Sequence, residues 1–189
     1  MQVRRPTVMW QSQEQQSLEY CTLAPTPDGY TGEGLVLQAL DRQPLRIDYQ
    51  ITCNHHWQTR LVSISQSTGS EIHHLRLTVD EQQRWWRDGV ELEQFAGLFD
   101  VDLSITPLTN TLPIRRLKLS VGESAAVTAL WVSFPERTLQ PLAQTYTRLA
   151  ENRYRYHSLP HDFTAELTVD ETGLVIDYEH LFTRVATDG

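Results

Sequence analysis

The chain has 189 residues, of which 40% are hydrophobic and 21% charged, and its formal net charge is -8 at pH 7. This length and balance suit a folded chain with a sizeable core, and they differ from those of disordered segments. We predict a single domain over residues 1–189. The Lys and Arg residues never form a run longer than a pair. Because an acidic surface repels phosphate backbones, we expect no nucleic-acid partner.

No stretch of the sequence approaches the ~20 apolar residues of a membrane-spanning helix, so an integral membrane protein is not expected. The segment Met1 to Pro6 contains two arginines but no apolar run, unlike a secretory leader. We therefore expect a cytoplasmic protein. Cys21 and Cys53 fit that expectation, because two distant cysteines in such a protein are usually small buried thiols.

Apolar residues recur with a period of two in several parts of the sequence. The pattern is clearest at Leu45, Ile47, Tyr49, Ile51 and Cys53, and it returns over 73–79 and 163–169. A period of two is typical of strands with one buried face. Gly29, Gly89, Gly122 and Gly173 stand between such segments, where tight turns favour glycine. Many short strands and few helical stretches predict a mainly β, many-stranded antiparallel fold.

Two segments depart from this alternation, 106–113 and 127–134, and 139–149 is a further helix candidate. Val127 to Phe134 carries large apolar groups on both faces, so this strand is central in the fold or lines a cavity or an interface. Leu139 to Leu149 could form a helix, but the residues from Gln144 to Thr147 favour an extended conformation.

The segment from Thr106 to Pro113 predicts one short helix. Thr106 is a good N-cap, and Pro107 suits the first helical position because its missing N–H needs no partner there. Pro113 cannot continue a regular helix. The predicted helix therefore covers about Pro107 to Leu112.

Charged residues flank this helix. Asp100 and Asp102 share one face of a predicted strand, and Arg115 and Arg116 follow the helix. The four side chains could form an ion-pair network that fixes the helix to the sheet. They could equally bind a polar headgroup, or the two acids could perform acid–base chemistry. The residues alone leave these alternatives open.

No cofactor or metal is expected. Members of the pairs His55-His56 and His73-His74 point to opposite faces of a strand, so neither pair can easily chelate one ion. Neither a phosphate-binding glycine loop nor a nucleophile motif is present in the sequence.

Aromatic residues with arginines nearby are the remaining candidates for ligand contacts. Arg60 follows Trp57 by three residues, and Tyr154 and Tyr156 share a face between two arginines. Aromatic rings stack on the C–H groups of sugars while guanidinium groups bind oxygen atoms. The same residues would also suit the core and rim of a β domain.

The run from Asp100 to Leu117, with its Thr-Asn-Thr-Leu-Pro-Ile-Arg-Arg core, resembles the signature of a bacterial glycolipid-binding family long classed as a domain of unknown function. Segments starting at Ser17, Cys53, Trp85, Gln144, Tyr154 and Asp170 follow in the family's order. The likeness covers about Leu18 to Arg184. One departure is Asn54, where the family pattern has Asp.

The resemblance implies a spiral β-roll, in which a many-stranded antiparallel sheet wraps around a single short α-helix. It also implies homodimers and a fold similar to the half-barrels of periplasmic lipoprotein carriers. The implied ligand is a glycolipid or another amphiphile.

We therefore expect a non-catalytic protein that holds an amphiphile in a groove of a curled sheet. The predicted ligand-binding residues are Trp57, Arg60, Asp100, Asp102, Asn110, Arg115, Arg116, Tyr154 and Tyr156. One alternative is a hydrolase or isomerase that uses Asp100 and Asp102 as an acid–base pair. The other is a dimeric interaction protein that binds no small ligand and pairs through the strand at 127–134.

Overall fold

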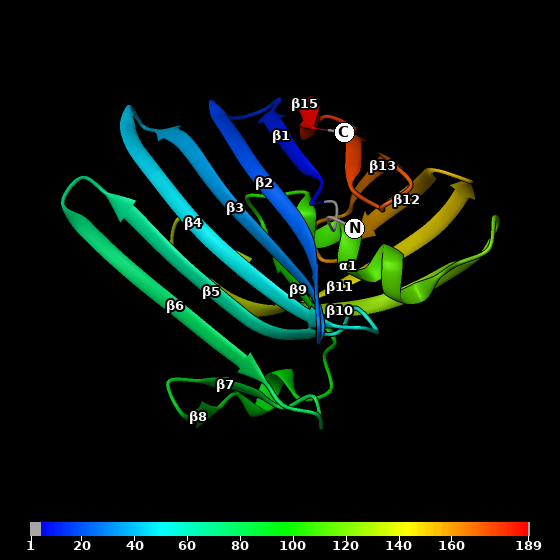
Figure 1. The fold of residues 1–189 in the computed structure, drawn as a ribbon, viewed down its shortest axis with the longest axis horizontal. Helices are drawn as coiled ribbons and strands as arrows, with labels where there is room; N and C mark the ends of the chain where they lie inside the picture. Colours follow the sequence, from blue (N-terminus) through cyan, green and yellow to red (C-terminus); the bar gives the residue numbers. More distant parts are fainter. Residues whose placement is uncertain (1–4, 189) are drawn as a thin grey trace.

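The computed structural model describes residues 5–188, and its strands form one sheet (Figure 1). The first half of the sheet contains β1 (Thr7–Ser12), β2 (Ser17–Thr26), β3 (Gly29–Leu40), β4 (Gln43–Asn54), β5 (Thr59–Thr68), β6 (Glu71–Val79), β7 (Trp85–Arg87) and β8 (Val90–Glu91). The second half contains β9 (Asp100–Leu103), β10 (Ser124–Ser133), β11 (Thr138–Ala150), β12 (Arg153–Ser158), β13 (Phe163–Val169), β14 (Val175–Tyr178) and β15 (Phe182–Asp188). A 3-10 turn, η1 (Glu93–Phe95), and the helix α1 (Leu108–Leu117) complete the elements.

The two halves of the sheet meet where β1 pairs with β15, and the free edges are β8 and β9. The neighbouring strands pair antiparallel, except that β9 runs parallel to β10. This exception arises because the chain crosses from the edge strand β8, through η1, to the opposite edge of the sheet. The carbonyl of Phe99, just before β9, accepts a hydrogen bond from the N–H of Thr59 at 2.9 Å. This bond links the segment before β9 to the start of β5.

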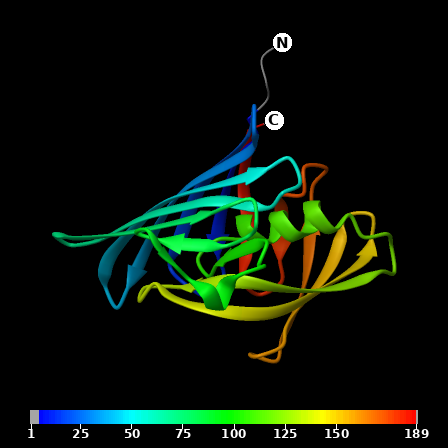
Figure 2. The ribbon, with the colours of Figure 1, turned by 90° about the horizontal axis from the view of Figure 1, so that it is seen from below.

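The sheet curls around α1 without closing into a barrel. Figure 2 shows α1 lying between the strands β2 to β6 on one side and the strands β10 and β11 on the other. The predicted spiral β-roll, with one sheet wrapped around a single helix, is therefore confirmed.

Most of the residues predicted to face inward form the core, although His73 is exposed. Leu45, Ile47, Tyr49, Ile51 and Cys53 are all buried on the inner face of β4. Cys21 and Cys53 are buried free thiols, as predicted.

The two ambiguous segments are both strands. Residues 139–149 lie within β11, so the extended interpretation is confirmed. In β10 both Leu130 and Val132 are fully buried, and Trp131 on the other face is half-buried beside His161. The large apolar side chains of β10 are therefore mostly covered by other parts of the same chain.

The prediction that the helix ends at about Leu112, before Pro113, is wrong. α1 begins at Leu108 and continues through Pro113 to Leu117, and Lys118 follows in a left-handed conformation. Pro113 cannot donate a hydrogen bond to the Thr109 carbonyl, which weakens the helix at this point. Burial compensates, because every residue from Leu108 to Ile114 is buried inside the roll. The helix begins one residue later than predicted, because Pro107 and not Thr106 is at the N-cap position. The Thr106 hydroxyl nevertheless accepts a hydrogen bond from the Leu108 N–H at 3.0 Å.

Two glycines of β3 allow this close packing. A Cβ atom on Gly32 would lie 2.6 Å from Cδ2 of Leu108, so glycine lets the helix approach the sheet. A Cβ atom on Gly34 would lie 2.2 Å from Cζ of Tyr49, so glycine makes room for the Tyr49 ring. Sequence spacing gave no reason to expect either contact.

We predict that Gly34→Ala lowers the free energy of unfolding by about 1–3 kcal/mol, as overpacking of a buried site does. Gly32→Ala should lower it less, because its new methyl group meets the flexible end of a leucine and not a rigid ring. Denaturant unfolding of both variants measures the difference. Equal stability of Gly34→Ala and the natural protein would contradict the assigned packing.

Candidate functional site

The predicted Asp/Arg cluster separates into two different environments. Asp100 is 1% exposed and forms a two-pronged ion pair with Arg116, whose Nε donates to Oδ1 at 3.1 Å while Nη2 donates to Oδ2. The Arg116 guanidinium also lies 5.2 Å from the centre of the Phe99 ring. Burial raises the pKa of the Asp100 carboxyl, and the Arg116 hydrogen bond and charge oppose that rise. This pair joins the end of α1 to β9.

Asp102 has neutral partners and no salt bridge among the described residues. Its carboxylate accepts hydrogen bonds from the side-chain amide of Gln144 and, at 3.5 Å, from the Thr109 hydroxyl. Burial of this carboxyl raises its pKa to about 6, and the nearby Asp100 adds to the effect. The two acids are therefore not an equivalent pair.

Asn110 contacts a cluster of aromatic side chains that was not predicted from the sequence. Its side-chain amide donates to the Tyr146 hydroxyl at 3.0 Å, and the Tyr146 ring stands edge-on to Tyr156 at 5.4 Å. Tyr156 in turn meets Tyr178 at 6.0 Å. These tyrosines are at most 6% exposed, so they form a packed interior wall and present no open surface.

Of the other predicted residues, Trp57 lies in the loop between β4 and β5 beside Arg115 of α1, and Arg60 lies in β5. Trp57 stacks on Tyr30 at 3.9 Å between ring centres, and the guanidinium of Arg115 lies 5.4 Å from the Trp57 ring. Arg60 donates to the Asp80 carbonyl at 3.0 Å. Asn54 accepts backbone N–H bonds from His56 and Gln58, both at 3.0 Å, so its amide organises this loop without a carboxylate.

Tyr154 is also buried, with the Arg148 guanidinium 5.7 Å from its ring centre. The predicted residues therefore lie at several separate places, and most have structural partners. None of them lines either of the two surface depressions described next.

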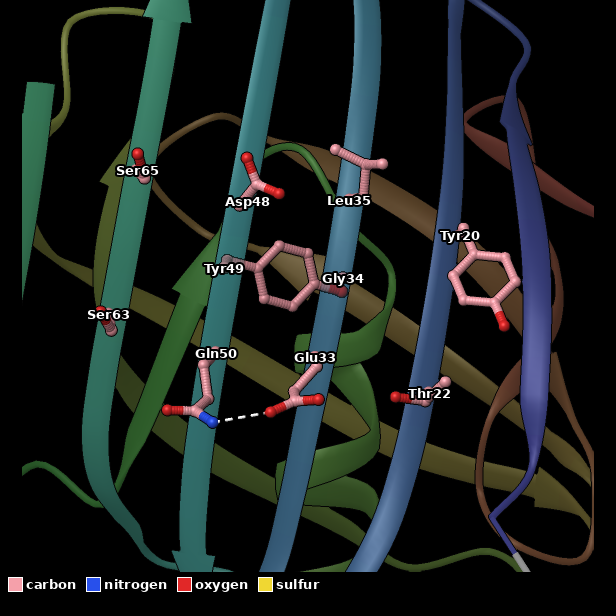
Figure 3. A pocket seen from close by; sticks show the side chains of 10 residues that line it. All are labelled: Tyr20, Thr22, Glu33, Gly34, Leu35, Asp48, Tyr49, Gln50, Ser63 and Ser65. Atoms are coloured by element: carbon pink, nitrogen blue, oxygen red, sulfur yellow. Dashed lines mark hydrogen bonds between the residues drawn. The ribbon is translucent and has the colours of Figure 1, made fainter. Parts of the chain in front are cut away.

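The first depression, of about 440 Å³, lies on the outer face of the sheet, opposite α1 (Figure 3). It contains two carboxylates and several hydroxyl groups but no basic side chain. Glu33 accepts a hydrogen bond from the Gln50 amide at 2.7 Å across its floor. Its lining residues are Tyr20, Thr22, Glu33, Gly34, Leu35, Asp48, Tyr49, Gln50, Ser63 and Ser65.

The second depression, of about 670 Å³, adjoins the first toward the β3–β4 and β5–β6 turns. Leu37, Arg46 and Ser67 line it, each two residues along the same strand from a residue of the first depression. Residues two apart share a face of a strand, so the depressions form one continuous surface. We call this surface the outer trough. Its second part contains the apolar side chains of Leu37, Ala39 and Pro44, and it is also lined by the polar residues Gln38, Arg42, Gln43, Arg46 and Ser67.

The outer trough can therefore offer different chemistry at its two ends. Carboxylate, amide and hydroxyl groups suit the hydroxyl groups of a polar molecule at one end, and apolar groups suit a hydrocarbon segment at the other. These residues were not predicted as ligand contacts, because they belong to the outward, polar half of each strand pattern. The sequence does contain a pattern that could have indicated them, because polar residues such as Ser63, Ser65 and Ser67 alternate with the apolar residues of the same strand.

These features define an open β-roll whose inner face is occupied by one helix and whose outer face carries a two-part trough. The family described as "Putative glycolipid-binding" matches residues 7–184, and the chain belongs to this family. A solved DUF1089 family protein from Pseudomonas aeruginosa is similar, with 34% sequence identity and a TM-score of 0.80. The similarity covers 88% of this chain and 92% of the other.

The comparison with curated proteins gave no match. No helix among residues 5–188 is long and apolar enough to cross a membrane.

We predict that Arg116→Met lowers the free energy of unfolding by about 3–5 kcal/mol, because it leaves the Asp100 charge buried without a partner. Asp100→Asn combined with Arg116→Met should be less destabilising than Arg116→Met alone, since no bare charge then remains. Removing Arg153 from its exposed pair with Glu166 serves as the control and should have a much smaller effect. Denaturant unfolding at pH 7 provides the comparison. Similar losses for the buried and the exposed pair would show that Arg116 does not anchor the helix.

Proposed function

We propose that this protein binds a glycolipid or a related amphiphile without chemical conversion, and that the outer trough holds it. The polar head lies in the first depression, where Glu33, Asp48 and Gln50 accept and donate hydrogen bonds. The hydrocarbon segment lies along Leu37 and the apolar groups of the second depression. The observation that carries the proposal is the direct continuity of a polar and a more apolar depression on one face of three strands.

The charge of the first depression favours an uncharged head, whereas Arg42 and Arg46 line the second depression. Two carboxylates line the first depression without a basic side chain. Arg46 lies at the junction, but both of its bonds, at 2.8 and 2.9 Å, go to Asp48. A phosphate or sulfate head would face these carboxylates and an overall charge of -8. Neutral sugar hydroxyls, by contrast, can donate to the carboxylates and accept from the serines.

Exposed apolar surface supports the same location. Tyr20 is 51% exposed and Leu37 is 52% exposed, and both line the trough. A ring face such as that of Tyr20 can stack on sugar C–H groups. Exposed apolar residues gathered around a depression are typical of a binding surface.

Binding is favoured over acid–base catalysis by the different environments of the two acids. The hydrolase or isomerase alternative needs Asp100 and Asp102 beside one accessible space. Asp100 is almost completely buried and is already paired with Arg116, while Asp102 is held by Gln144. Neither acid lines the outer trough.

The family resemblance also predicts a homodimer, and light scattering during gel filtration measures its mass. We expect twice the chain mass of 21.8 kDa. Ala129, Leu130 and Val132 of β10 are buried within the chain, which disfavours pairing through the predicted segment 127–134. A protein that elutes as a monomer over a wide concentration range would refute the dimer.

We predict that octyl glucoside, below its critical micelle concentration, shifts the backbone amide NMR signals of trough residues such as Leu37 and Ser65. Glucose alone should bind more weakly because it leaves the second depression empty. Octyl phosphate should also bind more weakly because of the carboxylates at Glu33 and Asp48. Titration at constant pH and salt gives the three affinities.

The matched variants are Ser65→Arg, in the trough, and Thr164→Arg, on an exposed position of β13. Ser65→Arg fills the polar depression and should weaken octyl glucoside binding at least about tenfold, or roughly 1.4 kcal/mol. Thr164→Arg should leave it unchanged. Equal affinities of the two variants would refute the location. Signal shifts confined to Trp57, Asp100 and Arg115 would instead support the residues predicted from sequence.

A further inference from the structure

A cluster of buried polar side chains lies behind the first depression, on the inner side of the sheet. The Tyr49 hydroxyl donates to Oε1 of Glu19, and the Thr106 hydroxyl donates to the same oxygen at 2.7 Å. The two hydroxyl groups are themselves 3.1 Å apart. Glu19 is 2% exposed, Thr106 is 3% exposed and Tyr49 is 4% exposed. Sequence analysis did not identify Glu19, which stands at a buried position of β2.

The cluster connects the outer trough to the helix. Tyr49 lines the first depression, and its ring reaches from β4 across Gly34 of β3 (Figure 3). On the other side, the Thr106 hydroxyl accepts a hydrogen bond from the Leu108 N–H at the start of α1. Glu19 is the acceptor shared by Tyr49 and Thr106, so it stands at the junction of the trough floor and the helix.

The second oxygen of Glu19 is buried and has no hydrogen-bond partner. None of the salt bridges among residues 5–188 includes Glu19. A buried carboxylate with neither a cation nor a full set of donors is strongly unfavourable, and the neutral acid is favoured instead. Burial raises the pKa of Glu19 to about 8, although the Tyr49 and Thr106 hydrogen bonds oppose the rise. The bonding pattern fits the neutral acid, with Oε1 as its carbonyl oxygen.

The other titratable groups of the cluster keep their protons in this pH range. Burial raises the pKa of Tyr49 well above its usual value, and Cys21 and Glu19 add to the effect. Burial likewise raises the pKa of the Cys21 thiol, whose Sγ lies 3.5 Å from the Tyr49 hydroxyl. Glu33 of β3 acts on the cluster only through its charge on Cys21. Glu19 is therefore the group of this cluster that we expect to titrate near pH 8.

We propose that Glu19 is a positioning residue for the outer trough. As a neutral acid it holds Tyr49 against Gly34 and ties the floor of the trough to the start of α1. As a carboxylate it accepts the same two hydrogen bonds more strongly, but its charge is buried and its second oxygen has no partner, so the carboxylate draws water into the cluster and loosens the packing behind the floor. The inference deepens the proposed function and rests on it only where ligand affinity is concerned, because the coupling of Glu19 to Tyr49 is a property of the free protein.

The test of the coupling uses the ligand-free chain labelled with ¹³C in its tyrosine rings, with the Tyr49 signal assigned by its loss in Tyr49→Phe. We expect the Tyr49 signal to move in one step near pH 8 in the natural protein. Glu19→Gln preserves the shape and the shared carbonyl oxygen of the neutral acid, so its signal should stay constant from pH 6.5 to 9. Asp102→Asn removes another buried acid and should keep the step. A flat Tyr49 signal in the natural protein, or a step that persists in Glu19→Gln, would overturn the proposal.

Thr106→Val provides a second variant that retains Glu19. It removes a hydrogen bond that lowers the pKa of Glu19, so the step should move to higher pH. Stability gives an independent measurement, because the folded pKa of Glu19 lies above its unfolded value. The stabilising contribution is complete below about pH 4.5 and is lost as the pH rises toward 8. Between pH 6.5 and 8.5 the melting temperature should therefore fall more in the natural protein than in Glu19→Gln.

Affinity connects the coupling to the trough. We expect octyl glucoside to bind the natural protein more weakly at pH 9 than at pH 7, and Glu19→Gln to bind it equally at both. An equal loss of affinity in the two proteins would refute the role of Glu19 in the trough. If octyl glucoside fails to bind at any pH, the proposed function fails, while the Tyr49 signal still decides whether Glu19 controls Tyr49.

Discussion

The structure depends on one constraint, which is that a helix with polar side chains is buried inside a curled sheet. Every residue of α1 from Leu108 to Ile114 is buried, and three of them are Thr109, Asn110 and Thr111. A buried polar group without a partner is destabilising by roughly 1–3 kcal/mol, so each of these side chains needs an acceptor or donor on the sheet. The strands around α1 supply those partners, including the Tyr146 hydroxyl for Asn110 and the Gly173 carbonyl for Thr111.

This requirement explains why the long Asp100 to Leu117 segment is so distinctive. Several of its residues must be compatible with the fold at the same time, because β9, the start of the helix and the end of the helix each bond to a different strand. Thr106 bonds to Glu19 of β2, while Arg116 returns to Asp100 of β9. A segment with so many specific partners identifies the fold strongly. Its charges are mostly engaged in holding the helix, which leaves few of them for a ligand.

The strands and their inward faces could be predicted from sequence because alternation is a local signal. The single helix and the burial of both cysteines were predictable for the same reason. The end of the helix was not, since Pro113 is tolerated only through packing that local rules do not include. The family pattern supplied the spiral architecture, which depends on β1 pairing with β15 across almost the whole chain.

The candidate site was less predictable than the fold. Asp100 and Arg116 form an ion pair, as their charges suggest. The pair lies in the interior, however, so Asp100 is not available at the surface. The outer trough requires knowledge of which strands are neighbours, because its polar floor comes from β3, β4 and β5 together. Glu19 and Tyr49 are 30 positions apart and meet only because Gly34 leaves space between their strands.

The helix inside the roll limits where on the sheet a ligand can bind. In a roll without a helix, the inner face would be the natural place for a hydrocarbon chain. Here α1 and the tyrosines around Asn110 occupy that space, so the described depressions are on the outer face. A ligand on an outer face stays partly open to water, which suits a molecule with a polar head. The same sheet that hides Glu19 on one side carries the trough on the other, so a proton on one face can influence the floor of the other.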